Sequence, residues 1–105
     1  MAQFDVYLNP NPGSRSFVPY VIDVQSSLID LLPTRLVMPL SRVGADQAKL
    51  PVNLAPTVEV EGEGLTLMAH LAAPVSARLL KKPVMSLAHR AHEVSAALDV
   101  VISGF

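Results

Sequence analysis

The chain has 105 residues, half of them hydrophobic, and its eight Lys and Arg against nine Asp and Glu give a net charge of −1. This length fits a single domain with one core, and the near-neutral charge disfavours direct, salt-driven binding of nucleic acid. Because cysteine is absent, disulfides and thiolate metal sites are excluded. So apolar a composition in a small domain predicts a face shared with a second subunit.

No segment has the features of an export signal or of a membrane span. Residues 1–14 lack a basic start and a long apolar centre, and no apolar run approaches the roughly 20 residues that a bilayer requires. We therefore expect one domain over residues 1–105 that works in the cytoplasm without membrane contact.

The first strand is predicted near the N-terminus. Phe4, Val6 and Leu8 alternate with more polar residues, which is the pattern of a strand with one buried face. Two prolines and a glycine within residues 9–14 then predict a loop that ends this strand.

Two apolar runs, rich in β-branched and large aliphatic residues, predict neighbouring strands over 17–24 and 35–43. Pro19 and Pro39 favour edges or bulges in them. The crossing between the runs is polar and contains Pro33, which has no backbone donor. Such a connection predicts a recognition loop rather than an active site.

A β-hairpin is predicted in the second half of the chain. Apolar residues alternate with polar or charged ones over 57–61 and again over 65–68, and residues 62–64 are Gly-Glu-Gly. One face of this hairpin should be exposed. Residues 44–51 are expected to form a polar loop and residues 75–80 a last short strand.

From Pro83 onward the hydrophobic period changes to that of a helix. Apolar residues recur at alternating spacings of three and four, so that one side is buried. His89, His92 and Glu93 lie on the opposite, wet side. Several strands followed by one helix predict an α+β domain. The predicted buried positions are Val84, Leu87, Ala91, Val94, Leu98 and Val101.

Few side chains are spaced for catalysis or metal binding. His89, His92 and Glu93 could converge on zinc, but no further ligand or zincin motif accompanies them. We therefore interpret them as a solvated face and expect no metal or other cofactor. His70 is interpreted as a structural histidine at the end of a strand, and the serines lack the context of an activated nucleophile.

Arg78, Lys81, Lys82 and Arg90 form the densest basic group of the sequence. They are interpreted either as cations on a solvated surface or as a docking site for an acidic segment of a partner protein. Both interpretations stay open at this point.

Short segments in a specific order and spacing carry a resemblance to a known family over nearly the whole chain. They are Gln3-Phe4-Asp5-Val6-Tyr7, Asp23-Val24-Gln25-Ser26, Leu28-Ile29-Asp30, Arg35-Leu36-Val37-Met38-Pro39-Leu40, Pro74-Val75-Ser76, Leu87-Ala88-His89-Arg90 and Gly104-Phe105. In these segments the chain resembles the CcdB family of plasmid and chromosomal toxins, whose members poison DNA gyrase.

The resemblance implies a small SH3-like β-barrel with a C-terminal α-helix, assembled as a two-fold homodimer. Family members are not enzymes: the dimer inserts its C-terminal residues into the cavity of the gyrase A subunit dimer and holds gyrase on cleaved DNA. A CcdA-like antitoxin is the implied second partner. The family's gyrase-contact positions correspond here to Leu28, Ile29, Asp99, Ile102, Ser103, Gly104 and Phe105.

One position departs from the family pattern, because Ser103 stands where the family has a tryptophan and the chain contains no Trp. An interfacial aromatic of this kind contributes at least ~2 kcal/mol, so its loss from both copies of a dimer costs about 4 kcal/mol, roughly a thousandfold in affinity. Phe105 is interpreted as a partial substitute.

Three functions therefore stay open. The first is a gyrase-binding toxin. The second is a relative that no longer poisons gyrase and mainly binds its antitoxin. The third is an mRNA-cleaving toxin of the same barrel, for which His70, Arg78 and the glutamates would be the candidate groups.

Overall fold

The computed structural model describes residues 2–26, 28, 31–42 and 55–103. Within these ranges the chain forms short antiparallel strands, several single turns of 3-10 helix and a C-terminal α-helix, α1 (Ala91–Ser103). The strands are β1 (Asp5–Leu8), β2 (Tyr20–Asp23), β3 (Thr34–Arg42), β4 (Thr57–Val60), β5 (Glu63–Leu67), β6 (Ala73–Ser76) and β7 (Met85–Ser86).

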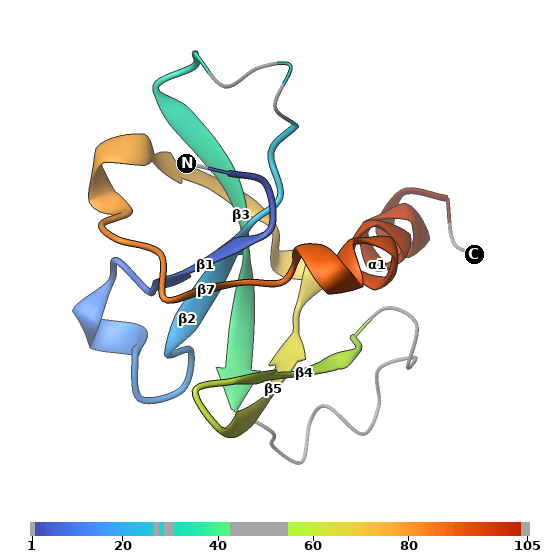
Figure 1. The fold of residues 1–105 in the computed structure, drawn as a ribbon, viewed down its shortest axis with the longest axis horizontal. Helices are drawn as coiled ribbons and strands as arrows, with labels where there is room; N and C mark the ends of the chain where they lie inside the picture. The colour runs from blue at the N-terminus through green and yellow to red at the C-terminus, as the bar shows by residue number, and fades with distance from the viewer. Residues whose placement is uncertain (1, 27, 29–30, 43–54, 104–105) are drawn as a thin grey trace.

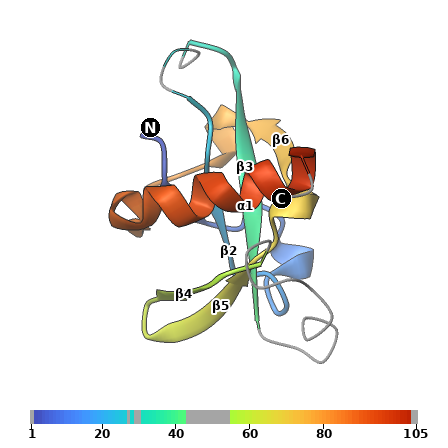
Figure 2. The same cartoon turned by 90° about the vertical axis from the view of Figure 1, so that its right-hand side faces the viewer.

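The strands form one antiparallel sheet in the order β4-β5-β3-β2-β1-β7, and β6 pairs with β3. The long strand β3 organises this sheet, since it pairs with β2 on one side and with β6 and then β5 on the other. The sheet curls into a nearly closed barrel (Figure 1), and α1 lies across one side of it (Figure 2). The predicted α+β barrel with a C-terminal helix is confirmed.

Both faces of the central strands are buried. One core cluster lies between the sheet and the helix and includes Ile22, Met38 and Val94. A second cluster on the other face joins Tyr7 with Leu80 and the neighbouring strand residues. The predicted alternation in the first strand is therefore wrong: both Val6 and Tyr7 are buried, whereas Leu8 is exposed.

Two strand boundaries differ from the prediction for reasons of backbone geometry. Phe4 has a φ of 73°, in the left-handed region that bulky residues rarely adopt, so β1 begins at Asp5. The second strand begins at Tyr20 instead of residue 17, because Val18 donates its backbone N–H to the Ser14 carbonyl in a turn (2.7 Å).

Pro39 lies in the middle of the central strand, not at an edge or a bulge as expected. It pairs with Val21 of β2, and its carbonyl accepts a hydrogen bond from the Met68 N–H (3.0 Å) on the opposite side. In an antiparallel strand the N and C=O of one residue point to the same side. The nitrogen of Pro39 therefore faces the place where the partner of β3 changes from β6 to β5, and no ladder donor is needed there.

The predicted β-hairpin is confirmed, but its turn consists of Glu61 and Gly62 rather than residues 62–64, since Glu63 and Gly64 already belong to β5. Both residues have positive φ, 53° and 79°, as in the two-residue type I′ turns that match the twist of the flanking strands. The strands pair from Val60 opposite Glu63 to Thr57 opposite Thr66.

The helix begins later than its hydrophobic period predicts. The Val84 N–H donates to the Val6 carbonyl and the Leu87 N–H to the Phe4 carbonyl (both 2.8 Å), so this segment completes the edge of the sheet as β7, and α1 starts only at Ala91. Of the six predicted buried positions, Leu87 and Val94 are buried, whereas Val84 and Val101 are exposed.

The remaining predicted elements have mixed outcomes. The strand predicted over 75–80 lies at 73–76 as β6, and residues 77–79 form a 3-10 turn. The predicted polar loop at 44–51 lies outside the described residues. Within the described ranges, no helix is both long and apolar enough to cross a bilayer.

Candidate protein-binding site

The last turn of α1 presents three of the residues that the family resemblance assigns to a partner contact. Val94 and Ala97 of the helix are buried against the barrel, so Asp99, Ile102 and Ser103 face solvent. Ile102 is 77% exposed, an unusual position for a large aliphatic side chain unless a partner covers it. Gly104 and Phe105 lie outside the described residues.

The polar groups of this last turn are arranged differently from those of an ordinary helix end. The Ser103 hydroxyl donates to the Asp99 carbonyl four residues earlier (2.7 Å), the local bond that a serine within a helix can make to its own backbone. Asp99 brings a negative charge to the negative end of the helix dipole, and the last turn contains no basic residue. This arrangement disfavours the isolated helix, and a cationic partner group would offset it.

The connection between β2 and β3 presents a second group of exposed apolar side chains. Leu28 is 92% exposed, Leu31 is 100% exposed and Leu32 is about half exposed. We call these three the exposed leucines. Ile29, also assigned to the partner contact by resemblance, lies outside the described residues. The described part of this connection projects from one end of the barrel (Figure 1).

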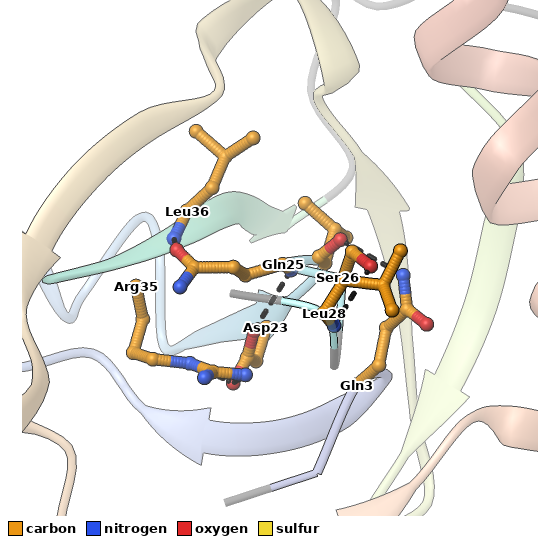
Figure 3. A network of polar contacts seen from close by, with 8 residues as sticks. Gln3, Asp23, Gln25, Ser26, Leu28, Arg35 and Leu36 are labelled. Atoms are coloured by element: carbon orange, nitrogen blue, oxygen red, sulfur yellow. Dashed lines mark hydrogen bonds and ion pairs between the residues drawn. The ribbon is translucent and has the colours of Figure 1, made fainter. Parts of the chain in front are cut away.

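A buried ion pair holds the two strand ends from which the exposed leucines project (Figure 3). Both Nε and Nη2 of Arg35 lie 2.8 Å from Oδ2 of Asp23, and the two side chains are 2% and 0% exposed. The other carboxylate oxygen of Asp23 accepts the Gln25 N–H (3.0 Å). The Gln25 side-chain oxygen in turn accepts the Leu36 N–H (3.0 Å).

Further hydrogen bonds extend this network along the chain. The side-chain amide of Gln3 donates to the Val24 carbonyl (3.1 Å), and the Leu28 N–H donates to the Ser26 hydroxyl (3.1 Å). We call the set Gln3, Asp23, Gln25 and Arg35 the polar anchor. Taking two charges out of water costs several kcal/mol per ion. The polar anchor therefore fixes the geometry at the base of the β2–β3 connection but adds little to the free energy of unfolding.

Sequence reasoning did not identify the polar anchor. The signal was present, since Asp23 interrupts a run of β-branched residues and Arg35 precedes another apolar run. A charge at such a position is almost never fully buried without a partner. Reading the two interruptions together would have predicted the pair.

Tyr7 lies next to the polar anchor in the second core cluster. Its hydroxyl is buried, with no hydrogen-bond partner among the described residues. Burial raises the pKa of the Tyr7 hydroxyl, and the nearby carboxylates of Asp5 and Asp23 raise it further, whereas the Arg35 guanidinium opposes them. Tyr7 is therefore a neutral phenol at physiological pH.

At the start of the helix, Arg90 forms a structural contact while the neighbouring histidines face solvent. As predicted, His89, His92 and Glu93 are exposed. Arg90 forms an ion pair with Glu93 and donates to the Thr57 carbonyl of β4 (2.9 Å), and the hydrogen bond from Arg90 lowers the pKa of Glu93. Arg90 therefore already has partners within the protein, and the predicted basic group for binding an acidic segment keeps only Arg78, Lys81 and Lys82.

His70 was interpreted as a structural histidine, and it lies exposed in the 3-10 turn that follows β5. Across the described ranges, no group of three or more His, Cys, Asp or Glu side chains is close enough to hold a metal ion.

The structure does not bring all the assigned residues together within one chain. The described part of the β2–β3 connection and the C-terminal turn of α1 lie apart in both views (Figures 1 and 2). Each presents large aliphatic side chains to solvent, Leu28 in one and Ile102 in the other. A partner would have to contact the molecule at two places.

Comparison with protein families supplies the context for this surface. The family described as CcdB protein matches residues 3–104, nearly the whole chain. The curled antiparallel sheet and the C-terminal helix agree with the fold expected from that match. The chain belongs to the CcdB family, whose members are toxins of toxin–antitoxin systems rather than catalytic enzymes.

Proposed function

We propose that this protein is a toxin that binds the A subunit of DNA gyrase and traps the gyrase–DNA cleavage complex without catalysing a reaction itself. The contact consists of Leu28 and Ile29 from the β2–β3 connection together with Asp99, Ile102, Ser103, Gly104 and Phe105. A CcdA-like antitoxin is the second partner, and the working form is a cytoplasmic homodimer.

The main support for this proposal is the exposure of large aliphatic side chains at assigned positions. Leu28 is 92% exposed and Ile102 is 77% exposed. Each comes from a supported element, since the polar anchor holds the base of the β2–β3 connection and the buried Val94 and Ala97 pack α1 against the barrel. Such protruding apolar groups on rigid supports suit insertion into a protein cavity.

A gyrase assay with matched variants tests the proposal. The purified protein is added to gyrase and supercoiled DNA, and cleavage complexes are counted after detergent treatment. Ile102→Asp and Leu28→Asp should each weaken complex formation about 30-fold, as expected when a central apolar contact of roughly 2 kcal/mol is lost. Leu8→Asp is the control, because Leu8 is a partly exposed apolar residue (47%) outside the assigned contact, and this variant should leave activity unchanged.

The experiment has two outcomes that contradict the proposal. Equal loss in all three variants would indicate a general effect of added negative charge. The absence of any cleavage complexes with the unmodified protein would reject gyrase as the target. Degradation of RNA by the unmodified protein would favour the ribonuclease function over gyrase binding.

A second function is favoured by the hydrogen bond of Ser103. Serine offers no aromatic surface where the family has a tryptophan, and the Ser103 hydroxyl is already bonded to the Asp99 carbonyl of its own helix. On this alternative the protein still binds an antitoxin but does not poison gyrase. Expression of the unmodified chain beside Ser103→Trp separates the two: harmless parent and lethal variant favour the alternative, whereas growth arrest by both favours the gyrase toxin.

The homodimer is tested separately. Phe17, Leu71 and Leu79 are further exposed large apolar side chains, consistent with surface that a second subunit covers. Sedimentation equilibrium of the purified protein at micromolar concentration should give twice the mass of 11.2 kDa. A concentration-independent monomer would contradict this part of the proposal.

A further inference from the structure

Two of the exposed leucines, Leu31 and Leu32, lie outside both core clusters and outside the contact assigned by resemblance. Leu31 is 100% exposed and Leu32 is 49% exposed. A single exposed leucine is common on protein surfaces. Together with Leu28, however, these two form an apolar group within one short connection, and such a group marks a surface that a partner covers.

The connection that carries these leucines is unusually apolar. From Val24 to Thr34 the sequence contains a single charged residue, Asp30. The last turn of α1 has a similar composition, with the exposed Ile102 beside the single acid Asp99. Two places with the same chemistry suit one partner that offers apolar surface to both.

The two ends of the connection are fixed to the barrel. The Val24 N–H donates to the Leu36 carbonyl, and the Pro33 carbonyl accepts the Ala77 N–H (both 2.9 Å). The polar anchor lies beneath them (Figure 3). Pro33 also restricts the backbone of Leu32, the residue before it, to extended conformations. Less conformational freedom is therefore lost when a partner covers this leucine.

We infer that Leu31 and Leu32 are specificity-determining contacts that extend the gyrase-binding surface beyond Leu28 and supply the apolar area that Ser103 does not. This inference rests on the proposed function, since the partner is the gyrase A subunit. The two leucines follow Leu28 by three and four positions in the same connection, so they are continuous with the assigned contact. An apolar surface of gyrase next to the one that covers Leu28 covers them.

The size of the effect matches what the missing tryptophan removes. Fully burying one exposed leucine side chain improves affinity by roughly tenfold to a hundredfold. In the proposed homodimer Leu31 is present twice, so its two copies contribute roughly a hundredfold or more. Leu32 adds less, because half of its surface is already covered. The sum is comparable with the roughly thousandfold that two interfacial tryptophans supply.

Biolayer interferometry on immobilised full-length gyrase A subunit measures this contact. The unmodified protein should bind saturably, and Leu31→Ala/Leu32→Ala should raise Kd at least about tenfold, mainly through faster dissociation. Leu31→Met/Leu32→Met keeps the apolar area and should stay within about threefold of the unmodified protein. Leu8→Ala is the matched control, because Leu8 is as exposed as Leu32 (47% against 49%), and it should bind like the unmodified protein.

Two measurements separate a contact from a structural effect. Leu31→Ala should leave the melting temperature unchanged, because this side chain is fully exposed, and should still weaken binding several-fold. Sedimentation equilibrium of Leu31→Ala/Leu32→Ala should give the same mass as the unmodified protein. A fall in mass by half would mean that the leucines join two subunits, and it would overturn the inference.

Adding the aromatic side chain back tests the exchange of one contact for the other. The β2–β3 connection and the last turn of α1 lie apart (Figures 1 and 2), so their contributions should add. Ser103→Trp in the Leu31→Ala/Leu32→Ala background should therefore regain most of the lost affinity, and no regain would contradict the inference. If the unmodified protein does not bind gyrase, the proposed function and this inference are both rejected. If it binds and the leucine truncations leave Kd unchanged, the inference alone is rejected.

Discussion

The polar anchor makes a quantitative prediction about the Asp23–Arg35 pair. In Arg35→Met the side chain keeps most of its stem but loses its charge, and the Asp23 carboxylate, which has no exposed surface and accepts both contacts of Arg35 at 2.8 Å, stays buried without its cation. Removing one partner of a buried ion pair, so that the other charge stays buried alone, lowers the free energy of unfolding by about 3–5 kcal/mol. That is a large share of the ~5–15 kcal/mol that stabilises a typical domain.

Urea unfolding followed by far-ultraviolet circular dichroism measures this cost, since the chain has no tryptophan to report by fluorescence. Arg35→Lys is the matched control: it keeps the charge but has a single nitrogen in place of the two that contact Asp23, so we expect a loss of roughly 1.5–3 kcal/mol. Asp23→Val/Arg35→Met removes both charges and should regain part of the loss seen in Arg35→Met, with about 1–3 kcal/mol remaining because the buried Gln25 N–H loses its acceptor. An Arg35→Met variant within 1 kcal/mol of the unmodified protein would refute this reasoning.

Three further predictions follow from single positions. Gly62→Ala should lower the free energy of unfolding by about 1 kcal/mol in urea titrations, because φ is 79° while an added Cβ would meet nothing within 4 Å; an unchanged midpoint would contradict the left-handed turn. Leu31→Asp should leave the melting temperature almost unchanged, because this side chain is fully exposed; a clear drop would mean that it is packed in solution. The lowered pKa of Glu93 stabilises the fold above the ordinary pKa of glutamate and is lost as pH falls through its folded value. Glu93→Gln should therefore melt below the unmodified protein at pH 7 and together with it at pH 2, and a difference that persists at pH 2 would rule out this ion pair as the cause.

Local sequence patterns predicted those parts of the fold that depend on local backbone chemistry. The hairpin could be predicted because glycine tolerates positive φ at a position where the strand alternation breaks, although the turn, at Glu61 and Gly62, begins one residue before the predicted one. The alternation of β1 could not, because the sheet buries side chains on both faces and the strand has no consistently polar side. Period-two patterning identifies a face only when the other face is wet.

The predicted start of the helix was wrong for a related reason. Val84 and Leu87 fit the helical period, but β1 offered an unpaired edge, and the backbone N–H groups of these two residues bond to it. A tertiary hydrogen-bond requirement therefore overrode the local period. Of the assigned contact residues, Leu28 and Ile102 are exposed, and their role in binding stays a prediction. The buried pair beneath Leu28 required three-dimensional information.

The imide of Pro39 has a consequence for how this barrel avoids misfolding. Because β3 is buried on both faces, as Val37 and Met38 illustrate, hydrophobicity alone would tolerate a one-residue slip that rolls the strand over. After such a slip the nitrogen of Pro39 would point at β2, where pairing calls for an N–H that proline lacks. Pro39 is therefore compatible with only one register of β3, and it destabilises off-register pairings while the sheet assembles.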